Sequence, residues 1–103
     1  MDLLQATEDH QKVEIFISCR TLKNKDVFSK SDPFVVFYMK SNVNSAMSRV
    51  GQTETVQDNL NPNFTKSFIV DYIFEVRQDC RFEVWDYDSD TKADFLGKKG
   101  KID

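Results

Sequence analysis

Residues 34–39 read FVVFYM, an unbroken run of aromatic, β-branched and other apolar side chains. The run favours β structure and predicts a strand that is covered on both faces. The segment in front of it, LKNKDVFSKSDP at residues 22–33, contains turn-forming residues. A buried strand entered from a polar loop is therefore the first element of the predicted fold.

Shorter segments on either side of this strand alternate between apolar and polar residues, which predicts strands with one buried face. Further, weaker strands are expected at residues 53–57 and 95–102, and residues 72–78 form either the tail of a strand or one helical turn. Strands at this spacing, separated by turns, predict an all-β protein, an antiparallel Greek-key β-sandwich. The residues expected on the buried faces are Val13, Ile15, Ile17, Cys19, Phe64, Phe68, Val70, Cys80, Phe82 and Val84.

Length and composition limit the protein to one small domain. The chain has 103 residues, of which 40% are hydrophobic, and nine Phe are too many for a disordered tail. No apolar run is long enough to span a membrane. Residues 1–11 lack the profile of a secretion signal and are expected to form a flexible leader before a single domain at residues 12–103. A net charge of −3 argues against nucleic acid as a partner.

The chain has too few cysteines and histidines to favour a zinc site, a disulfide framework or a histidine-based catalytic site. Cys19 and Cys80 lie in separate apolar segments, which favours reduced core thiols of a cytosolic protein over zinc ligands or a disulfide framework. His10 is the single histidine and lies in the predicted leader. No nucleophile, base or phosphate-binding glycine loop accompanies the carboxylates, so we expect no enzyme activity.

Aspartate is concentrated in two of the predicted loops. Asp26 and Asp32 lie in the first loop, and the second loop carries Asp86, Asp88, Asp90 and Asp94. If both loops lie at one end of the sandwich, their carboxylates repel one another by about 4 kcal/mol per close pair at an effective dielectric near 20. Calcium removes this conflict, because it takes six to eight oxygen ligands in flexible geometry.

Two simpler interpretations of the aspartates compete with a calcium site. Asp is a common turn residue, so the loops could be acidic only for solubility. The second loop also matches the start of an EF-hand. An EF-hand is excluded because Thr91 stands where glycine is needed, Gly97 stands where glutamate is needed, and predicted strands flank the loop.

The sequence resembles a C2 domain, the calcium-dependent phospholipid-binding module built as an eight-stranded β-sandwich. The resemblance rests on SKSDPF at 29–34, LNPNF at 60–64, FEVWDYD at 82–88 and ADFLG at 93–97. A narrower resemblance, in FIVDYIFEVRQDCRFEV at 68–84 and VEIFISCR at 13–20, is to the first C2 domain of copines. The family fold needs about one or two more strands than this sequence supplies, so the domain is expected to be incomplete at its C-terminal end.

The resemblance implies a set of ligands for two to three calcium ions. By position these are Asp26, Asp32, Asp86, Asp88 and Asp94, with backbone carbonyls near Lys25 and Tyr87 completing the shell. Thr91 lies where some members add an oxygen, and Asp90 is an additional carboxylate expected in an outer shell or in solvent.

The expected function is calcium-dependent binding to anionic phospholipid, without catalysis, by a cytoplasmic protein that is recruited to the plasma membrane or an endomembrane when calcium rises. Val27 and Phe28 lie between the first-loop ligands and either insert into the membrane or fold back onto the sandwich. Lys30 and Lys92 flank the site and are candidate headgroup contacts. The alternative is a protein-interaction or signalling adaptor module, with calcium structural or absent. The sequence does not indicate an oligomeric state.

Overall fold

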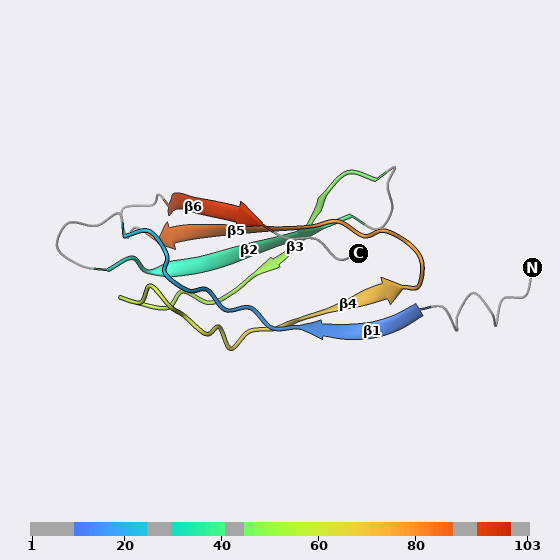
Figure 1. Ribbon diagram of the computed structural model, residues 1–103, viewed down its shortest axis with the longest axis horizontal. Helices are drawn as coiled ribbons and strands as arrows, with labels where there is room; N and C mark the ends of the chain where they lie inside the picture. Colours follow the sequence, from blue (N-terminus) through green and yellow to red (C-terminus); the bar gives the residue numbers. More distant parts are fainter. Residues whose placement is uncertain (1–9, 25–29, 41–44, 88–92, 100–103) are drawn as a thin grey trace, which may run out of the picture.

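The computed structural model describes residues 10–24, 30–40, 45–87 and 93–99. These residues form two antiparallel sheets, which lie as two layers in Figure 1. The connections from β1 to β2, from β3 to β4 and from β4 to β5 each pass from one sheet to the other. The prediction of an all-β antiparallel sandwich is confirmed. The smaller sheet pairs β1 (His10–Ile15) with β4 (Phe68–Ile73); the larger has the order β3 (Ser48–Gln52), β2 (Pro33–Met39), β5 (Cys80–Tyr87) and β6 (Ala93–Lys99).

The core lies between the two sheets and is centred on Phe37, whose side chain is fully buried. The Phe37 ring stacks on Phe82 with ring centroids 4.7 Å apart and meets the edge of Phe68 at 5.3 Å. Val70 and Cys80 complete the buried cluster. Because Phe37 and Phe82 are directly paired across β2 and β5, the stacked rings follow from the strand register.

Alternating burial along the strands agrees with the sequence pattern. Residues 13, 15, 17 and 19 are partly buried, whereas residues 14, 16, 18 and 20 are exposed. Phe64, Phe68 and Val70 are buried, and Ile69 between the last two is 67% exposed. In β2, Val35 and Phe37 are fully buried and Val36 on the opposite face is 7% exposed, as expected for a strand covered on both faces.

The predicted strand at residues 53–57 is wrong. The strand in this part of the chain is β3, which lies just before that range at Ser48–Gln52. β3 is an edge strand with four of its five residues exposed, so it carries no apolar alternation that would indicate it. Thr53 still contacts β2: its N–H donates to the carbonyl of Val35 at 2.8 Å, and its Oγ1 accepts from the N–H of Val35 at 2.9 Å. Thr53 therefore continues the contact with β2 while the regular ladder ends.

Other element boundaries also differ from the sequence expectations. β1 begins at His10, inside the expected leader, because His10 and Gln11 pair with Ile73 and Tyr72. β6 is shifted toward the N-terminus relative to residues 95–102, in register with β5. β4 ends at Ile73, and a turn closed by the N–H of Val76 and the carbonyl of Ile73 replaces the helical alternative. Within the described residues there is no helix that could span a membrane.

Contacts between β1 and β4 stop where β1 ends, and separate backbone contacts follow. Ser18 and Asn63 form an isolated bridge, and the N–H of Cys19 donates to the carbonyl of Pro62 at 3.0 Å. Pro62 has no N–H to donate, so a regular ladder cannot pass through it. Cys19 is half-buried here, and this burial raises the pKa of its thiol, while neighbouring Arg20 acts in the opposite direction.

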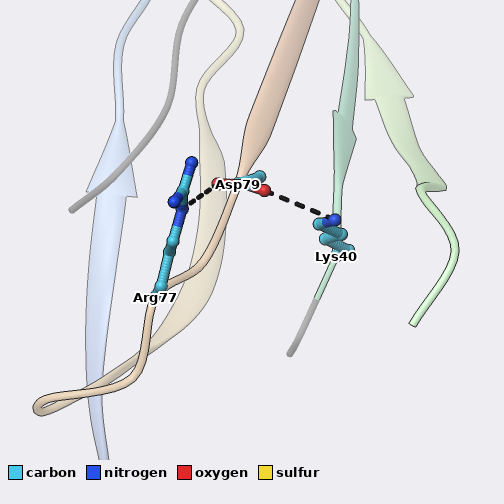
Figure 2. A network of polar contacts seen from close by, with 3 residues as sticks. All are labelled: Lys40, Arg77 and Asp79. Carbon is cyan, nitrogen blue, oxygen red and sulfur yellow. Dashed lines mark hydrogen bonds and ion pairs between the residues drawn. The ribbon is translucent and has the colours of Figure 1, made fainter. Parts of the chain in front are cut away.

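An ion-pair network joins the end of β2 to the start of β5 (Figure 2). The Asp79 carboxylate lies 2.9 Å from Nε of Arg77 and 3.4 Å from Nζ of Lys40. The hydrogen bond from Arg77, followed by that from Lys40, lowers the pKa of the Asp79 carboxyl. A carboxylate at this end of the larger sheet thus has two cationic partners.

Candidate functional site

The opposite end of the larger sheet brings together aspartates from both predicted loops. β2 begins, β5 ends and β6 begins at this end, because the three strands are antiparallel neighbours. Asp32 directly precedes β2, and Asp86 is the register partner of Pro33 on one side and of Asp94 on the other. The strand register therefore places Asp86 between the first loop and the second.

Proline at the first position of β2 helps to form this arrangement. Pro33 is fully buried and has no N–H, so it is suited to the start of a strand. Its carbonyl accepts from the N–H of Val56 at 3.0 Å, and the carbonyl of Asp32 accepts from the N–H of Tyr87 at 2.9 Å. The backbone before β2 is thereby tied to two other segments of the chain.

Three backbone N–H groups donate to the acidic side chains and link them in a chain of hydrogen bonds. The N–H of Lys30 donates to Oδ1 of Asp58 at 2.8 Å, and the N–H of Asp58 donates to Oδ1 of Asp32 at 2.7 Å. The N–H of Asp32 then donates to Oδ1 of Asp86 at 2.8 Å. Hydrogen bonds from backbone N–H groups to carboxylates are charge-assisted and short, so they hold each side chain in one orientation.

The charges of these aspartates are not balanced by cations in the described part of the chain. Asp86 is only 3% exposed, and a buried carboxylate normally needs a counter-charge. Among the described residues, the ion pairs involve Asp71, Asp79 and Glu83, and none reaches Asp32, Asp58 or Asp86. Asp79, by contrast, has two cationic partners. The aspartates at the other end of the sheet therefore lack a counter-charge among the described residues.

The donor chemistry fits a hard cation such as calcium. Asp32 and Asp86 each accept a backbone N–H at Oδ1, and no bond within the described segments uses Oδ2 of either residue. Carboxylate oxygens are the ligands that calcium prefers. The described residues alone do not make a complete site, since they include no group of three or more His, Cys, Asp or Glu placed to hold a metal ion.

Several residues of the predicted site lie outside the described residues, so the structure does not place them. The exposed Lys30 is described, and its N–H is used by Asp58. For Asp94 the structure gives the strand register and no side-chain surroundings. The predicted site residues that fall outside are Lys25, Asp26, Val27, Phe28, Asp88, Asp90, Thr91 and Lys92.

The sequence pattern does not identify Asp58 as part of this region. It predicts a turn at residues 58–63, and Asp58 is indeed an exposed residue in the connection between β3 and β4. Its φ of 55° is in the left-handed region, which Asp and Asn enter more readily than most other residues. The pair Asp58-Asn59 is a turn signal, but nothing in its spacing indicates contact with Asp32, 26 residues earlier.

Comparison with known proteins gives consistent matches. Copine-B of Dictyostelium discoideum is 44% identical over 81 residues, which cover 79% of this chain. The chain spans only 15% of the length of that curated relative. Among solved structures, BON1-C2B is 28% identical with a TM-score of 0.70, over 98% of this chain and 69% of that one.

A second solved structure shares the fold at lower identity. It is a calcium-bound structure of two domains of Extended-Synaptotagmin 2, and it is 24% identical with a TM-score of 0.65, over 92% of this chain and 34% of that one. The C2 domain family model matches residues 11–99, a range that includes all of β2 to β6 and most of β1. The chain therefore belongs to the C2 domain family.

Proposed function

We propose that this chain is a non-catalytic module that binds anionic phospholipid in a calcium-dependent manner. Calcium and phospholipid binding are typical of C2 domains, and the family match covers residues 11–99. The observation that carries the proposal is the nearly buried Asp86 carboxylate. It lies beside Asp32 without a cationic partner among the described residues.

The proposed ligands for two to three calcium ions are Asp26, Asp32, Asp86, Asp88 and Asp94. Asp32 and Asp86 offer Oδ2, because Oδ1 of each accepts a backbone N–H. Asp88 follows Tyr87 directly in sequence, and Asp94 is the register partner of Asp86. Thr91 and Asp90 have secondary roles in this proposal.

Bound calcium changes the sign of the charge at this end of the sandwich. Without calcium, the aspartates repel anionic headgroups; with it, lipid phosphates complete the open coordination positions. Val27 and Phe28 supply apolar contacts with the membrane, and Lys30 and Lys92 supply contacts with headgroups. The protein is then recruited from the cytoplasm to the membrane surface when calcium rises.

Calcium titration by calorimetry and co-sedimentation with vesicles containing phosphatidylserine test this function. We expect the chain to bind calcium and to sediment with vesicles only when calcium is present. Asp86→Asn should abolish both, because it removes the charge of a carboxylate that is only 3% exposed. Asp71→Asn is the matched control, since Asp71 lies on β4 in the other sheet and pairs with exposed Lys12 at 2.6 Å.

Two results would contradict the proposal. The first is sedimentation that is equal with and without calcium, and the second is no sedimentation at any calcium concentration. Either result would favour the alternative of a protein-interaction module, in which calcium is structural or absent.

A further inference from the structure

Asp58 joins the β3–β4 connection to the segment before β2, which lies far from it in sequence. It is exposed, it lies in the β3–β4 connection, and it makes one hydrogen bond through its side chain and another through its backbone. Its Oδ1 accepts the N–H of Lys30, two residues before Asp32, and its own N–H donates to Oδ1 of Asp32. Asp58 therefore fixes both the backbone that leads to Asp32 and the Asp32 carboxylate itself.

The carboxylate contact has a direct consequence for coordination. A carboxylate with both oxygens free can rotate about χ2, whereas a short hydrogen bond to one oxygen holds the group in one plane. Since the N–H of Asp58 lies 2.7 Å from Oδ1 of Asp32, Oδ2 is the oxygen left for a cation. The same division holds for Asp86, whose Oδ1 accepts the N–H of Asp32. The orientation of Asp86 thus depends on the backbone that Asp58 holds.

The backbone conformation of Asp58 is necessary for this contact. A φ of 55° turns its N–H toward Asp32 while its side chain turns back toward Lys30. Asn and Gly adopt this conformation readily, but residues such as Ala do so at a cost. Of these three, Asn alone keeps both the conformation and an oxygen that accepts the N–H of Lys30.

We infer that Asp58 is a positioning residue for Asp32 and raises calcium affinity through its conformation and its hydrogen bonds. This inference rests on the proposed function, in which Asp32 and Asp86 bind calcium. Groups that orient the ligands of a metal typically change its affinity about 10- to 100-fold when they are removed. A similar change is expected here.

Three substitutions separate conformation, hydrogen bonding and charge. Asp58→Asn removes only the charge, Asp58→Gly removes the acceptor but keeps the conformation, and Asp58→Ala removes the acceptor and strains the backbone. Calorimetric titration of the whole chain with calcium should show Asp58→Asn within about threefold of wild type and Asp58→Ala weakened at least about tenfold. Asp58→Gly should lie between them. Asp79→Ala, at the opposite end of the sheet, is the control for loss of an aspartate outside the site.

The outcomes distinguish this inference from the proposed function. If wild type binds calcium and Asp32→Asn/Asp86→Asn does not, but Asp58→Ala and Asp58→Gly bind like wild type, the positioning role is wrong while the site stands. Equal losses in Asp58→Asn and Asp58→Ala would identify Asp58 as a charged ligand and also overturn the inference. If wild type does not bind calcium, the proposed function and this inference fall together. Should Asp58→Ala not fold, which a thermal melt without calcium reveals, Asp58→Gly against Asp58→Asn decides.

Discussion

The backbone N–H of Asp32 donates to Oδ1 of Asp86 at 2.8 Å, across 54 residues of sequence. This bond joins the residue before β2 to a nearly buried carboxylate on β5. It orients Asp86 and leaves its second oxygen available, so the two predicted aspartate loops are connected before any cation binds. Calcium binding at this point should therefore stabilise the packing of β2 against β5.

The double substitution Asp86→Asn/Asp88→Asn should abolish the calcium-induced rise in melting temperature. A ligand that binds only the folded state stabilises it by about 2.7 kcal/mol when its concentration is a hundred times its Kd. Removing two carboxylates should raise the Kd for calcium above the millimolar concentration used in the measurement, so the stabilisation is lost. The measurement is thermal unfolding with and without millimolar calcium. Asp71→Asn should keep the full rise, and an unchanged rise in the double variant would place the site elsewhere.

Phe28→Ser should weaken vesicle binding and leave calcium affinity in solution unchanged. Burying a Phe side chain at the membrane interface contributes about 1.5–3 kcal/mol, so the loss should be about tenfold or more. Vesicle co-sedimentation at saturating calcium measures the first quantity, and calorimetry without lipid measures the second. Phe74→Ser, in the exposed β4–β5 turn at the other end of the sandwich, is a matched control. Equal vesicle binding by Phe28→Ser would refute insertion and favour a ring folded back onto the sandwich.

Phe37→Ala should destabilise the fold strongly, because Phe37 is the centre of the core. The ring is fully buried, stacks on Phe82 and meets Phe68, so its removal leaves a cavity and costs about 3–5 kcal/mol. Chemical denaturation measures the change. Phe16→Ala, at a side chain that is 68% exposed, should change the free energy of unfolding by less than about 0.5 kcal/mol. Similar effects of the two substitutions would contradict the assigned core.

Glu54 should make stability depend on pH in the acid range. Its partial burial opposes ionisation, but hydrogen bonds from the N–H and hydroxyl of Thr65 and the N–H of Lys66 lower its pKa from 4.5 to about 2. A lowered carboxyl pKa gives stability that is complete above about pH 4.5 and is lost as the pH falls through about 2.

Glu54→Gln tests this dependence. At pH 7 it should destabilise the fold by less than about 1 kcal/mol, since the side chain is solvent-accessible and its interactions are screened. The difference in melting temperature between Glu54→Gln and wild type should shrink between pH 4.5 and 2. Glu75→Gln, in the exposed β4–β5 turn, controls for charge removal. A difference that stays constant with pH would show that Glu54 acts by packing alone.

Strands with one buried face could be predicted from the sequence, whereas edge strands and contacts made by single backbone groups could not. The alternation in residues 13–20 and the FVVFYM run are local patterns created by burial, and they predict the buried faces correctly, although the regular strand β1 ends at Ile15. The alternation in residues 80–84 predicts the strand β5 but not its faces, because residues 81–85 are all partly buried. β3 buries little, and its pairing depends on β2, so residues 48–52 look like a loop. Asp32 and Asp86 can be found because both are acidic and adjoin strands or their ends. Asp58 cannot, because its role depends on one N–H and a positive φ.

Gly51 lies on β3 opposite Phe37, and its Cα faces the Phe68 ring. A Cβ added to Gly51 would lie 2.9 Å from Cε1 of Phe68, closer than carbon atoms approach without displacement. Phe68 is 5% exposed and its ring meets Phe37, so it has little room to move. Replacing a strand glycine by alanine usually gains about 0.5–1 kcal/mol from backbone entropy, but overpacking costs about 1–3 kcal/mol. The second effect is larger, so Gly51→Ala should lower stability.

Chemical denaturation of Gly51→Ala, Phe68→Leu and the double variant measures this overpacking directly. Leu is shorter than Phe and makes room for the new methyl group, so the double variant should be more stable than the sum of the two single effects predicts. Ser48→Ala, at an exposed position of the same strand, should be close to neutral and controls for alanine in β3. Additive effects in the double variant, or a stabilising Gly51→Ala, would mean that β3 lies farther from Phe68. In that case Gly51 would matter only through its backbone.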